Sequence, residues 1–375
     1  MQLTSEQNEM LDSVDKLVSA HIAPIAAAID RDDSVPRSVV DTCGDMGLLQ
    51  FRVPVDYNGP GGTALDACLI RERIARTSAV CSLFAGQNSI IIQPLLAHGT
   101  REQKERFLPL LAQGRSLTAI AITEAEAGSD VRAMQTRATL RGDRYVISGR
   151  KSMISHGVGA DLMLLFAKTD SSHQISAFLF DPRQVQGMQV GPREPTMGLR
   201  GHPIHELIFE DLELPIESRI GAEGDGFLML TRTLTLNRPM VGAMAVGLAQ
   251  GALDAATAYA RERRQFGRPI IEHQAIQIML ADMAMQVEAA RSLVYRCVLQ
   301  LDNGDLADFQ IKSSMAKCFA SDVAMQVTTD AVQVLGGYGY TNAFPVERMM
   351  RDAKITQIFE GTNQIQRLII AREMA

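Results

Sequence analysis

Hydrophobic and polar positions follow a helical period along the first third of the chain. Thr4 and Gln7 form a capping box in front of an amphipathic segment. Thr100 and Gln103 repeat this cap before a later amphipathic segment. Largely apolar helical runs lie between the two caps. We therefore expect an N-terminal α-helical domain over residues 1–117.

The pattern changes after residue 117 to short runs with a period of two or with β-branched residues. Four runs read as strands, "RYVISG", "LMLLFAKT", "QISAFLF" and "HELIFEDLEL", and turn signals such as "RGD" and "DSSH" separate them. Helical patterns return at Gly224, and the long segment from Leu236 is apolar almost all round, as expected of a central bundle helix. The chain is therefore expected to be an α+β protein, with a middle antiparallel β domain over 118–222 and a C-terminal four-helix bundle over 223–375.

Length and charge narrow the class of protein. The 375 residues, 46% of them hydrophobic, exceed what one compact core usually organises. The net charge is −6, and acidic and basic residues are interspersed without a basic stripe, which argues against nucleic acid as a partner. The N-terminus is acidic and capped like a helix, and no apolar run approaches the roughly 20 residues of a membrane span. We expect a cytoplasmic protein without a membrane span.

Cysteine and histidine positions do not suggest a metal site or a disulfide framework. The five cysteines are scattered and include no CxxC pair. The seven histidines show no metal-ligand spacing. We expect reduced cysteines that lie mostly in the core, and no bound metal.

One carboxylate occupies an unusual place in the stretch "IFEGTNQIQRLII", where Glu360 stands between an apolar pair and a Gly-Thr turn before an apolar helix. A carboxylate in a dry pocket has a raised pKa and accepts protons better than in water. A charge near a helix N-terminus also interacts favourably with the helix dipole. From this stretch alone, Glu360 is either a catalytic base or a helix-terminal charge.

Seven ordered motifs across the chain resemble the acyl-CoA dehydrogenase family, and the C-terminal half is most similar to the straight-chain, medium-chain type. They are "ITEAEAGSD", "GRKSMISHG", "MGLRGHPIHELIFEDLELP", "LNRPMVGAMAVGLAQGAL", "RERRQFGRPIIEHQAIQ", "DAVQVLGGYGYTNAFPVERMMRDAKI" and "IFEGTNQIQR". The resemblance implies an FAD enzyme that removes a proton next to a thioester carbonyl while a hydride leaves the next carbon for flavin N5. It also implies the three-domain fold of the family.

The resemblance assigns the proton-accepting role to the glutamate of the "EGT" motif, which is Glu360. Some relatives place the base on the central helix instead, where this chain has Asn237, and an amide is no base at neutral pH. Arg238 keeps the family pattern, whereas Thr235 stands where many relatives have an aspartate that contacts the substrate. The substrate-binding residues implied by the resemblance are Ser129, Arg238 and Gly361.

The residues that the resemblance implies for FAD come from several motifs and are expected to serve two neighbouring subunits. Arginine suits the pyrophosphate because its planar fork donates two parallel hydrogen bonds. Glycines let a ligand approach the main chain. The cofactor-binding residues are Ile122, Thr123, Gly128, Ser129, Met153, Ile154, Ser155, Arg263, Gln265, Phe266, Gln333, Leu335, Gly336, Gly337, Thr362 and Gln364.

Three further positions depart from the family pattern. Met153 replaces the tryptophan of the usual "WIT" or "WIS" triplet, and an apolar, polarizable side chain fills the space without reproducing an indole stack. His202 stands in the strand motif that often reads "R-x-S-P-T", and a lone histidine there is expected to be structural or exposed. Phe359 replaces a frequent tyrosine beside the base. Ser82 and Gly86, on the helix expected to face the acyl tail, are small.

These observations predict FAD-dependent α,β-dehydrogenation of a saturated acyl-CoA to the trans-2-enoyl-CoA, with an electron-transfer flavoprotein as acceptor. The resemblance also implies a homo-oligomer, either a dimer or a homotetramer built from dimers. Three alternatives stay open: a biosynthetic dehydrogenase acting on a carrier-protein-bound acyl or aminoacyl thioester, an oxidase that uses oxygen, and a non-catalytic acyl-thioester-binding flavoprotein.

Overall fold

The computed structural model describes residues 3–169 and 174–374, so the predicted "DSSH" turn lies outside the described residues. The N-terminal domain is helical, as expected, with both predicted capping boxes present. The amphipathic segment after Thr4 is interrupted by a π-helical turn, Val18–Ile22, and by a 3-10 turn that contains Pro24, because proline lacks the backbone N–H that a helix needs. The helices are α1 (Ser5–Leu17), α2 (Ala26–Asp32), α3 (Arg37–Asp45), α4 (Ala64–Ala75), α5 (Ala79–Phe84), α6 (Ser89–His98) and α7 (Arg101–Ala112).

The apolar run expected to form one helix after Ser82 is divided into α5 and α6. Gly86 between them has a φ of 75°, which favours glycine, and its N–H donates to the carbonyl of Leu48 over 2.9 Å. Arg71 on α4 donates to the carbonyl of Ala85 through Nε and Nη2, over 3.1 and 2.7 Å. These tertiary hydrogen bonds hold the break open beside the central helix.

The middle domain is an eight-stranded sheet with the order β6-β7-β3-β2-β4-β5-β8, and β1 pairs with β4. Most pairings are antiparallel, but β1 and β2 both pair with β4 in parallel, so the expectation of a purely antiparallel domain is wrong in this detail. The strands are β1 (Thr118–Ala121), β2 (Arg137–Arg141), β3 (Arg144–Ser155), β4 (Leu162–Thr169), β5 (Ile175–Phe180), β6 (Met188–Arg193), β7 (Ile204–Pro215) and β8 (Arg219–Ile220).

Strand β4 is buried on both faces, which explains its continuous apolar sequence. Leu164 and Phe166 pack in a core with residues of α6, α7 and the start of α8. Met163 and Leu165, which point to the other face, join a core formed by the sheet itself. The sheet is thereby fixed against the helical part of the molecule.

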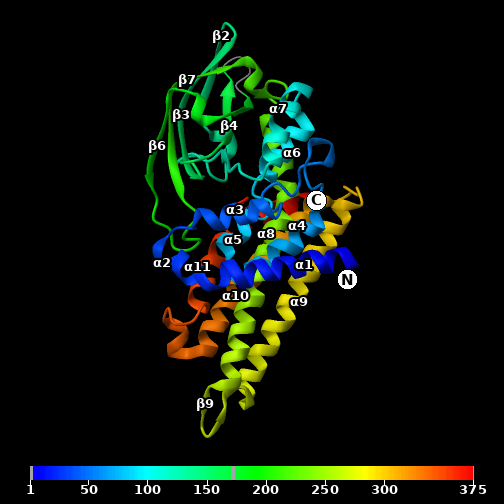
Figure 1. Ribbon diagram of the computed structural model, residues 1–375, viewed down its shortest axis with the longest axis vertical. Coiled ribbons are helices and arrows are strands. Elements are labelled where there is room, and N and C mark those ends of the chain that lie inside the picture. Colours follow the sequence, from blue (N-terminus) through cyan, green and yellow to red (C-terminus); the bar gives the residue numbers. More distant parts are fainter. Residues whose placement is uncertain (1–2, 170–173, 375) are drawn as a thin grey trace.

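The C-terminal domain is built on three long helices, α8 (Gly226–Glu262), α9 (Gln274–Asp302) and α10 (Phe309–Leu335). Two shorter helices, α11 (Val346–Thr356) and α12 (Asn363–Glu373), both pack against α10, so two helices complete the expected bundle where one was predicted. A small hairpin, β9 (Arg264–Gln265) with β10 (Arg268–Pro269), joins α8 to α9. Figure 1 shows the sheet at one end of the molecule and β9 at the opposite end of the long helices.

Glycines on α8 permit close contact with neighbouring helices. A Cβ placed on Gly247 would lie 2.3 Å from the carbonyl oxygen of Glu72 on α4, and one on Gly242 would lie 2.8 Å from a methyl of Val294 on α9. Neither position accommodates a side chain without displacement of its neighbour. These glycines therefore allow α8 to pack closely against α4 and α9.

Two apolar helical stretches, Ala79–His98 and Gly226–Glu262, are long and apolar enough to cross a membrane by length and composition, contrary to the sequence-based expectation. However, 78% and 72% of their most apolar windows are buried within the protein, as in core helices. All five cysteines are buried and unpaired, in agreement with the expectation.

Candidate functional site

Glu360 lies in the turn between α11 and α12, in a left-handed backbone conformation with φ 57°, followed by Gly361 with φ 90°. Lys317 on α10 is fully buried and holds this turn: its Nζ donates to the carbonyl of Gly361 over 2.8 Å and to Asn363 Oδ1 over 2.9 Å. Gln366 donates to the same Gly361 carbonyl over 2.9 Å. The backbone around Glu360 is therefore fixed by side chains from two helices.

The carboxylate of Glu360 has one occupied and one free oxygen. Oε1 accepts a hydrogen bond from Asn237 Nδ2 on α8 over 2.5 Å, whereas Oε2 is enclosed and has no partner in the described part of the chain. Burial raises the pKa of Glu360, and the hydrogen bond from Asn237 opposes this rise. Nearby cations oppose it too, namely Arg71, Arg238 and Lys317. The group is a desolvated carboxylate with a free lone pair.

This geometry argues against Glu360 as the residue that caps α12. The N-cap of α12 is Thr362, whose side chain accepts from the N–H of Ile365 over 3.3 Å. The Glu360 side chain instead points to α8, where Asn237 binds it. Thr362 therefore performs the capping, and Gln364 is exposed on the first turn of α12.

Pro239 shapes the segment of α8 beside this carboxylate. Proline provides no N–H for the carbonyl four residues earlier, which belongs to Thr235, and this carbonyl accepts from Ser313 Oγ on α10 over 2.7 Å. Arg238 is buried and donates through Nη1 to Ser314 Oγ over 3.1 Å, while its Nε has no partner among the described residues. Burial lowers the pKa of Arg238 to about 10, so its guanidinium is still charged at neutral pH.

The loop that contains Gly128 and Ser129 is held by a buried ion pair. Lys151 Nζ on β3 lies 2.8 Å from Glu124 Oε1 and also donates to the carbonyl of Ile122 over 2.8 Å. The N–H of Ser152 donates to the carbonyl of Thr123 over 2.8 Å. Burial lowers the pKa of Lys151 to about 8. Gly128 and Ser129 themselves are exposed, and a Cβ placed on Gly128 would meet no atom within 4 Å.

The strand end at residues 153–155 meets a pair of buried histidines. Met153 is 59% exposed and has a φ of 59°, so its side chain stands out from the strand. His156 and His202 pack edge to face with ring centroids 4.6 Å apart. One nitrogen of each, His156 Nε2 and His202 Nδ1, is enclosed without a partner in the described residues. Burial lowers both pKa values, so both rings are neutral. His202 packs against His156 and is not exposed.

A second group of predicted residues lines a cavity of about 590 Å³ at the tip of the bundle. Phe266, at the hairpin between α8 and α9, is 95% exposed. A Cβ added to Gly336 or Gly337 would meet no atom within 4 Å, so the main chain there is open to a ligand. The predicted residues that line this cavity are Arg263, Gln265, Phe266, Leu335, Gly336 and Gly337, and Gln333 lies exposed on the preceding turn.

The two groups of predicted FAD residues lie at different ends of one chain. Asn237 beside Glu360 and Arg263 beside the cavity are both at or next to α8, and a rise of 1.5 Å per residue separates them by about 39 Å. An open glycine-lined cradle with arginine suits a pyrophosphate and an adenosine. Met153 and the loop at Gly128 are exposed and therefore open to the flavin ring. The residues present therefore fit FAD. The residues for the flavin half lie near Glu360, and those for the adenosine half line the cavity at Arg263.

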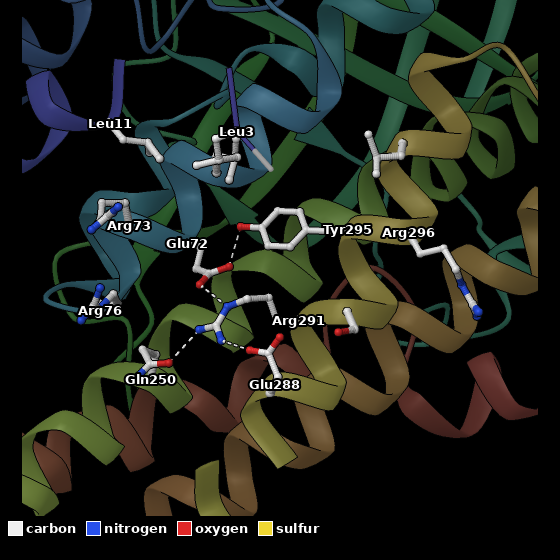
Figure 2. Close-up of a pocket in the computed structure, with 13 residues that line it drawn as sticks. Leu3, Leu11, Glu72, Arg73, Arg76, Gln250, Glu288, Arg291, Tyr295 and Arg296 are labelled. Carbon is white, nitrogen blue, oxygen red and sulfur yellow. Dashed lines mark hydrogen bonds and ion pairs between the residues drawn. The ribbon is translucent and has the colours of Figure 1, made fainter. Parts of the chain in front are cut away.

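Another cavity, of about 720 Å³, lies between α1, α4, α8 and α9 and contains none of the predicted site residues. Figure 2 shows a hydrogen-bonded group around Glu72 and Arg291: Glu72 accepts from Tyr295 over 2.5 Å and from Arg291 Nε over 2.9 Å. Arg291 also binds Glu288 and Gln250. These mutual contacts satisfy the polar groups, so we assign no reaction to this cavity.

Several residues of the Glu360 site were not singled out from the sequence. They are Arg71, Lys317 and Asn363, together with the ion pair formed by Glu124 and Lys151. A charged residue inside an apolar helical pattern is the signal that could have found Arg71 in "DACLIRERIA" and Lys317 in "SSMAKCFAS". Their partners come from distant segments and cannot be read from local pattern.

Comparison with known families matches three family models in order along the chain. The acyl-CoA dehydrogenase N-terminal domain matches residues 4–115, the middle domain residues 119–212 and the C-terminal domain residues 224–375. Together they span most of the described structure.

Individual proteins agree with these family models. The chain is 44% identical to the probable acyl-CoA dehydrogenase FadE25 of Mycobacterium tuberculosis, over 99% of this chain and 96% of that protein. The structure matches butyryl-CoA dehydrogenase from Megasphaera elsdenii with a TM-score of 0.96 and 37% identity, covering 100% and 99% of the two chains. The prolyl acyl carrier protein oxidase AnaB matches with a TM-score of 0.94 and 27% identity, covering 100% of both chains. This chain belongs to the acyl-CoA dehydrogenase family, whose members are FAD-binding oxidoreductases that act on CH–CH bonds.

Proposed function

We propose that this protein dehydrogenates a saturated acyl-CoA to the trans-2-enoyl-CoA, with Glu360 as the base that removes the α-proton. The observation that carries the proposal is the carboxylate of Glu360, which is buried and keeps Oε2 free while Asn237 holds Oε1. A desolvated carboxylate with a free oxygen is suited to accept a proton from carbon.

The surrounding side chains orient and tune this base. Lys317 and Gln366 fix the turn that bears it, so the free oxygen keeps one position. Cations nearby favour the ionised form, which is the form that can accept a proton. Arg238, charged and buried beside the site, would stabilise negative charge that develops on the substrate as the proton leaves.

FAD, when bound, supplies the acceptor for the hydride. The loop at Ile122, Thr123, Gly128 and Ser129 and the strand end at residues 153–155 would hold the ring. Arg263, Gln265 and Phe266, with Leu335, Gly336 and Gly337, would hold the adenosine and pyrophosphate half of a neighbouring copy's cofactor. The separation of about 39 Å along α8 supports this division, and therefore a dimer or a dimer of dimers.

An anaerobic titration tests the proposal. The flavin absorbance of the purified holoprotein is followed while straight-chain acyl-CoAs of increasing length are added, beside the Glu360→Gln variant. Glutamine keeps the shape and the bond to Asn237 but cannot accept the proton. Rapid bleaching in the wild type and its loss in Glu360→Gln is the expected result. Equal bleaching in both proteins would refute the role of Glu360.

A carrier-protein thioester is the second candidate substrate. Thr235 stands where many relatives place an aspartate, and its hydroxyl donates within its own helix to the carbonyl of Thr231 over 2.8 Å. A relative of the same fold, AnaB, is a prolyl acyl carrier protein oxidase. Bleaching by a loaded carrier protein and not by any acyl-CoA would favour this candidate. The higher identity to proteins named for CoA esters favours acyl-CoA.

An electron-transfer flavoprotein is the proposed electron acceptor, and the cytoplasm is the proposed location. Rapid reoxidation of the substrate-reduced protein by such a flavoprotein, with slow reoxidation in air, is the expected behaviour. A reduced flavin that air reoxidises within seconds would favour an oxidase instead.

A further inference from the structure

Arg71 on α4 is a buried cation beside the proposed base. It is 5% exposed, and it lies near enough to Glu360 for each group to affect the other's pKa. Its guanidinium is anchored by main-chain acceptors at the end of α5, the carbonyls of Ala85 and Leu83. Within the described part of the chain, no carboxylate forms an ion pair with it.

Main-chain carbonyls orient this guanidinium but do not neutralise it. The bonds to Ala85 and Leu83 use Nε and Nη2, and Nη1 makes no hydrogen bond among the described residues. An unpaired charge inside a protein is strongly unfavourable, so buried cations normally have an anionic partner. Among the described residues, Arg71 Nη1 is therefore an unused hydrogen-bond donor, and no carboxylate is bound to the guanidinium to balance its charge.

The wider site carries an excess of positive charge. Arg71, Arg238 and Lys317 all act on Glu360, and Lys317 also interacts with Asp322, so three cations face two carboxylates among the described residues. The nearby histidine, His202, is neutral and adds no negative charge. A site with more cations than anions favours an additional anion from the ligand.

Arg71 binds the chain segment around Gly86, which the family resemblance implies faces the acyl tail. A Cβ placed on Gly86 would lie 2.6 Å from Met240 Cε and 4.0 Å from Arg71 Nη2, so Gly86, Met240 and Arg71 lie next to one another. Met240 is three residues after Asn237 on α8, and residues three apart share a helix face. Asn237, which binds Glu360, and Met240, which lies beside Gly86 and Arg71, are therefore about one helical turn apart on α8, roughly 5 Å along the helix axis.

We propose that Arg71 selects acyl groups that end in a carboxylate, and that the substrates are short dicarboxylic acyl thioesters. The inference rests on the proposed function, because it places the acyl chain between Glu360 and Gly86. Arg71 Nη1 would donate to the distal carboxylate, and the charge of the substrate would neutralise the guanidinium. A neutral acyl chain of the same length would leave Arg71 unpaired and would bind less well.

Matched thioesters test this preference on the holoprotein. Succinyl-CoA is compared with butanoyl-CoA, glutaryl-CoA with pentanoyl-CoA, and adipoyl-CoA with hexanoyl-CoA. Anaerobic flavin reduction gives the rate and the apparent Kd, and calorimetric titration gives the binding constant separately. In the wild type, we expect at least one dicarboxylic thioester to bind about ten- to hundredfold more tightly than its neutral counterpart.

The variant Arg71→Met removes the charge and keeps an apolar side chain of similar reach. We expect it to abolish the preference, because the dicarboxylic thioesters should be weakened much more than their neutral counterparts. Arg73→Met is the matched control, because Arg73 lies on the same helix and pairs with Asp15 outside the site. Arg71→Lys keeps the charge without the planar fork, and we expect it to retain part of the preference.

Three outcomes would overturn the inference: equal binding of both members of every pair by the wild type, equal weakening of both members in Arg71→Met, or the same change in Arg73→Met. If Arg71→Met does not fold, the wild-type ratios and Arg71→Lys decide. A binding preference without flavin reduction by any thioester would refute the proposed dehydrogenation and leave the carboxylate selection supported. Flavin reduction without a preference would support the proposed dehydrogenation and refute the selection of a carboxylate by Arg71.

Discussion

The hydrogen bond from Asn237 to Glu360 gives a quantitative prediction about the pH dependence of the reaction. Nδ2 of Asn237 lies 2.5 Å from Oε1, and this bond lowers the pKa of a carboxyl group that burial raises. Asn237→Leu keeps the approximate volume and removes the donor. The pKa of Glu360 is therefore expected to rise in the variant.

The size of the rise follows from the strength of such a bond. A hydrogen bond to a charged group contributes about 1.5–3 kcal/mol, and 1.36 kcal/mol corresponds to one pKa unit. Because the base must be ionised, the rate of flavin reduction on the acid limb should fall about ten- to hundredfold, and the alkaline plateau should change little.

Stopped-flow measurement of anaerobic flavin reduction across pH tests this reasoning. Thr233→Val is the matched control, because Thr233 is buried on the same helix and its hydroxyl binds only the carbonyl of Met229, over 2.8 Å. An acid limb at the same pH in Asn237→Leu and wild type would contradict the argument. A loss of rate that is uniform across pH would show that Asn237 positions the base without tuning its pKa.

Two further predictions concern buried charges that support the site. Lys151→Met leaves Glu124 buried without its cation, and we expect a loss of about 3–5 kcal/mol in the free energy of unfolding, measured by urea denaturation. Burial raises the pKa of Asp352 from 3.8 to about 6, so the folded state binds the proton more tightly and stability falls as pH rises through this window. Asp352→Asn should remove this fall, raising the free energy of unfolding by up to about 3 kcal/mol above pH 6 and by little near pH 4.

Control variants distinguish these effects from an unspecific loss of stability. The double variant Glu124→Gln, Lys151→Met removes both charges and should recover part of the stability lost in Lys151→Met; no recovery would contradict the ion-pair explanation. Asp330→Asn on α10 should leave the pH dependence of stability unchanged. A wild-type stability that rises between pH 4 and pH 6 relative to Asp352→Asn would contradict the assigned sign.

Much of the architecture was predictable because it depends on local pattern. The capping residues Thr4 and Thr100 form the expected boxes, and the apolar run of β4 forms a strand buried on both faces. The parallel pairing of β1 with β4 was not predictable, because it joins strands separated by 44 residues and leaves no local signature. The break at Gly86 likewise depends on partners elsewhere in the sequence: the Gly86 N–H donates to the carbonyl of Leu48, and Arg71 donates to the carbonyl of Ala85.

The candidate site was likewise predictable only in part from the sequence. Glu360 could be proposed from its motif, and the cavity formed around Arg263 and Gly336 brings together residues predicted from two separate motifs. The bond between Asn237 and Glu360 spans 123 positions, and the environment of the base depends on it. Asn237 was considered only as a position that lacks a base, and its role as a hydrogen-bond donor appears only in the fold.

The length of α8 links cofactor retention to protein concentration. If one chain offers the two halves of the FAD site about 39 Å apart, each cofactor is held by two copies, and dissociation of the copies exposes half of it to water. Dilution should then release FAD, and added FAD should oppose dissociation, because a ligand that binds only the assembled form stabilises that form. The amount of cofactor bound becomes a measure of assembly.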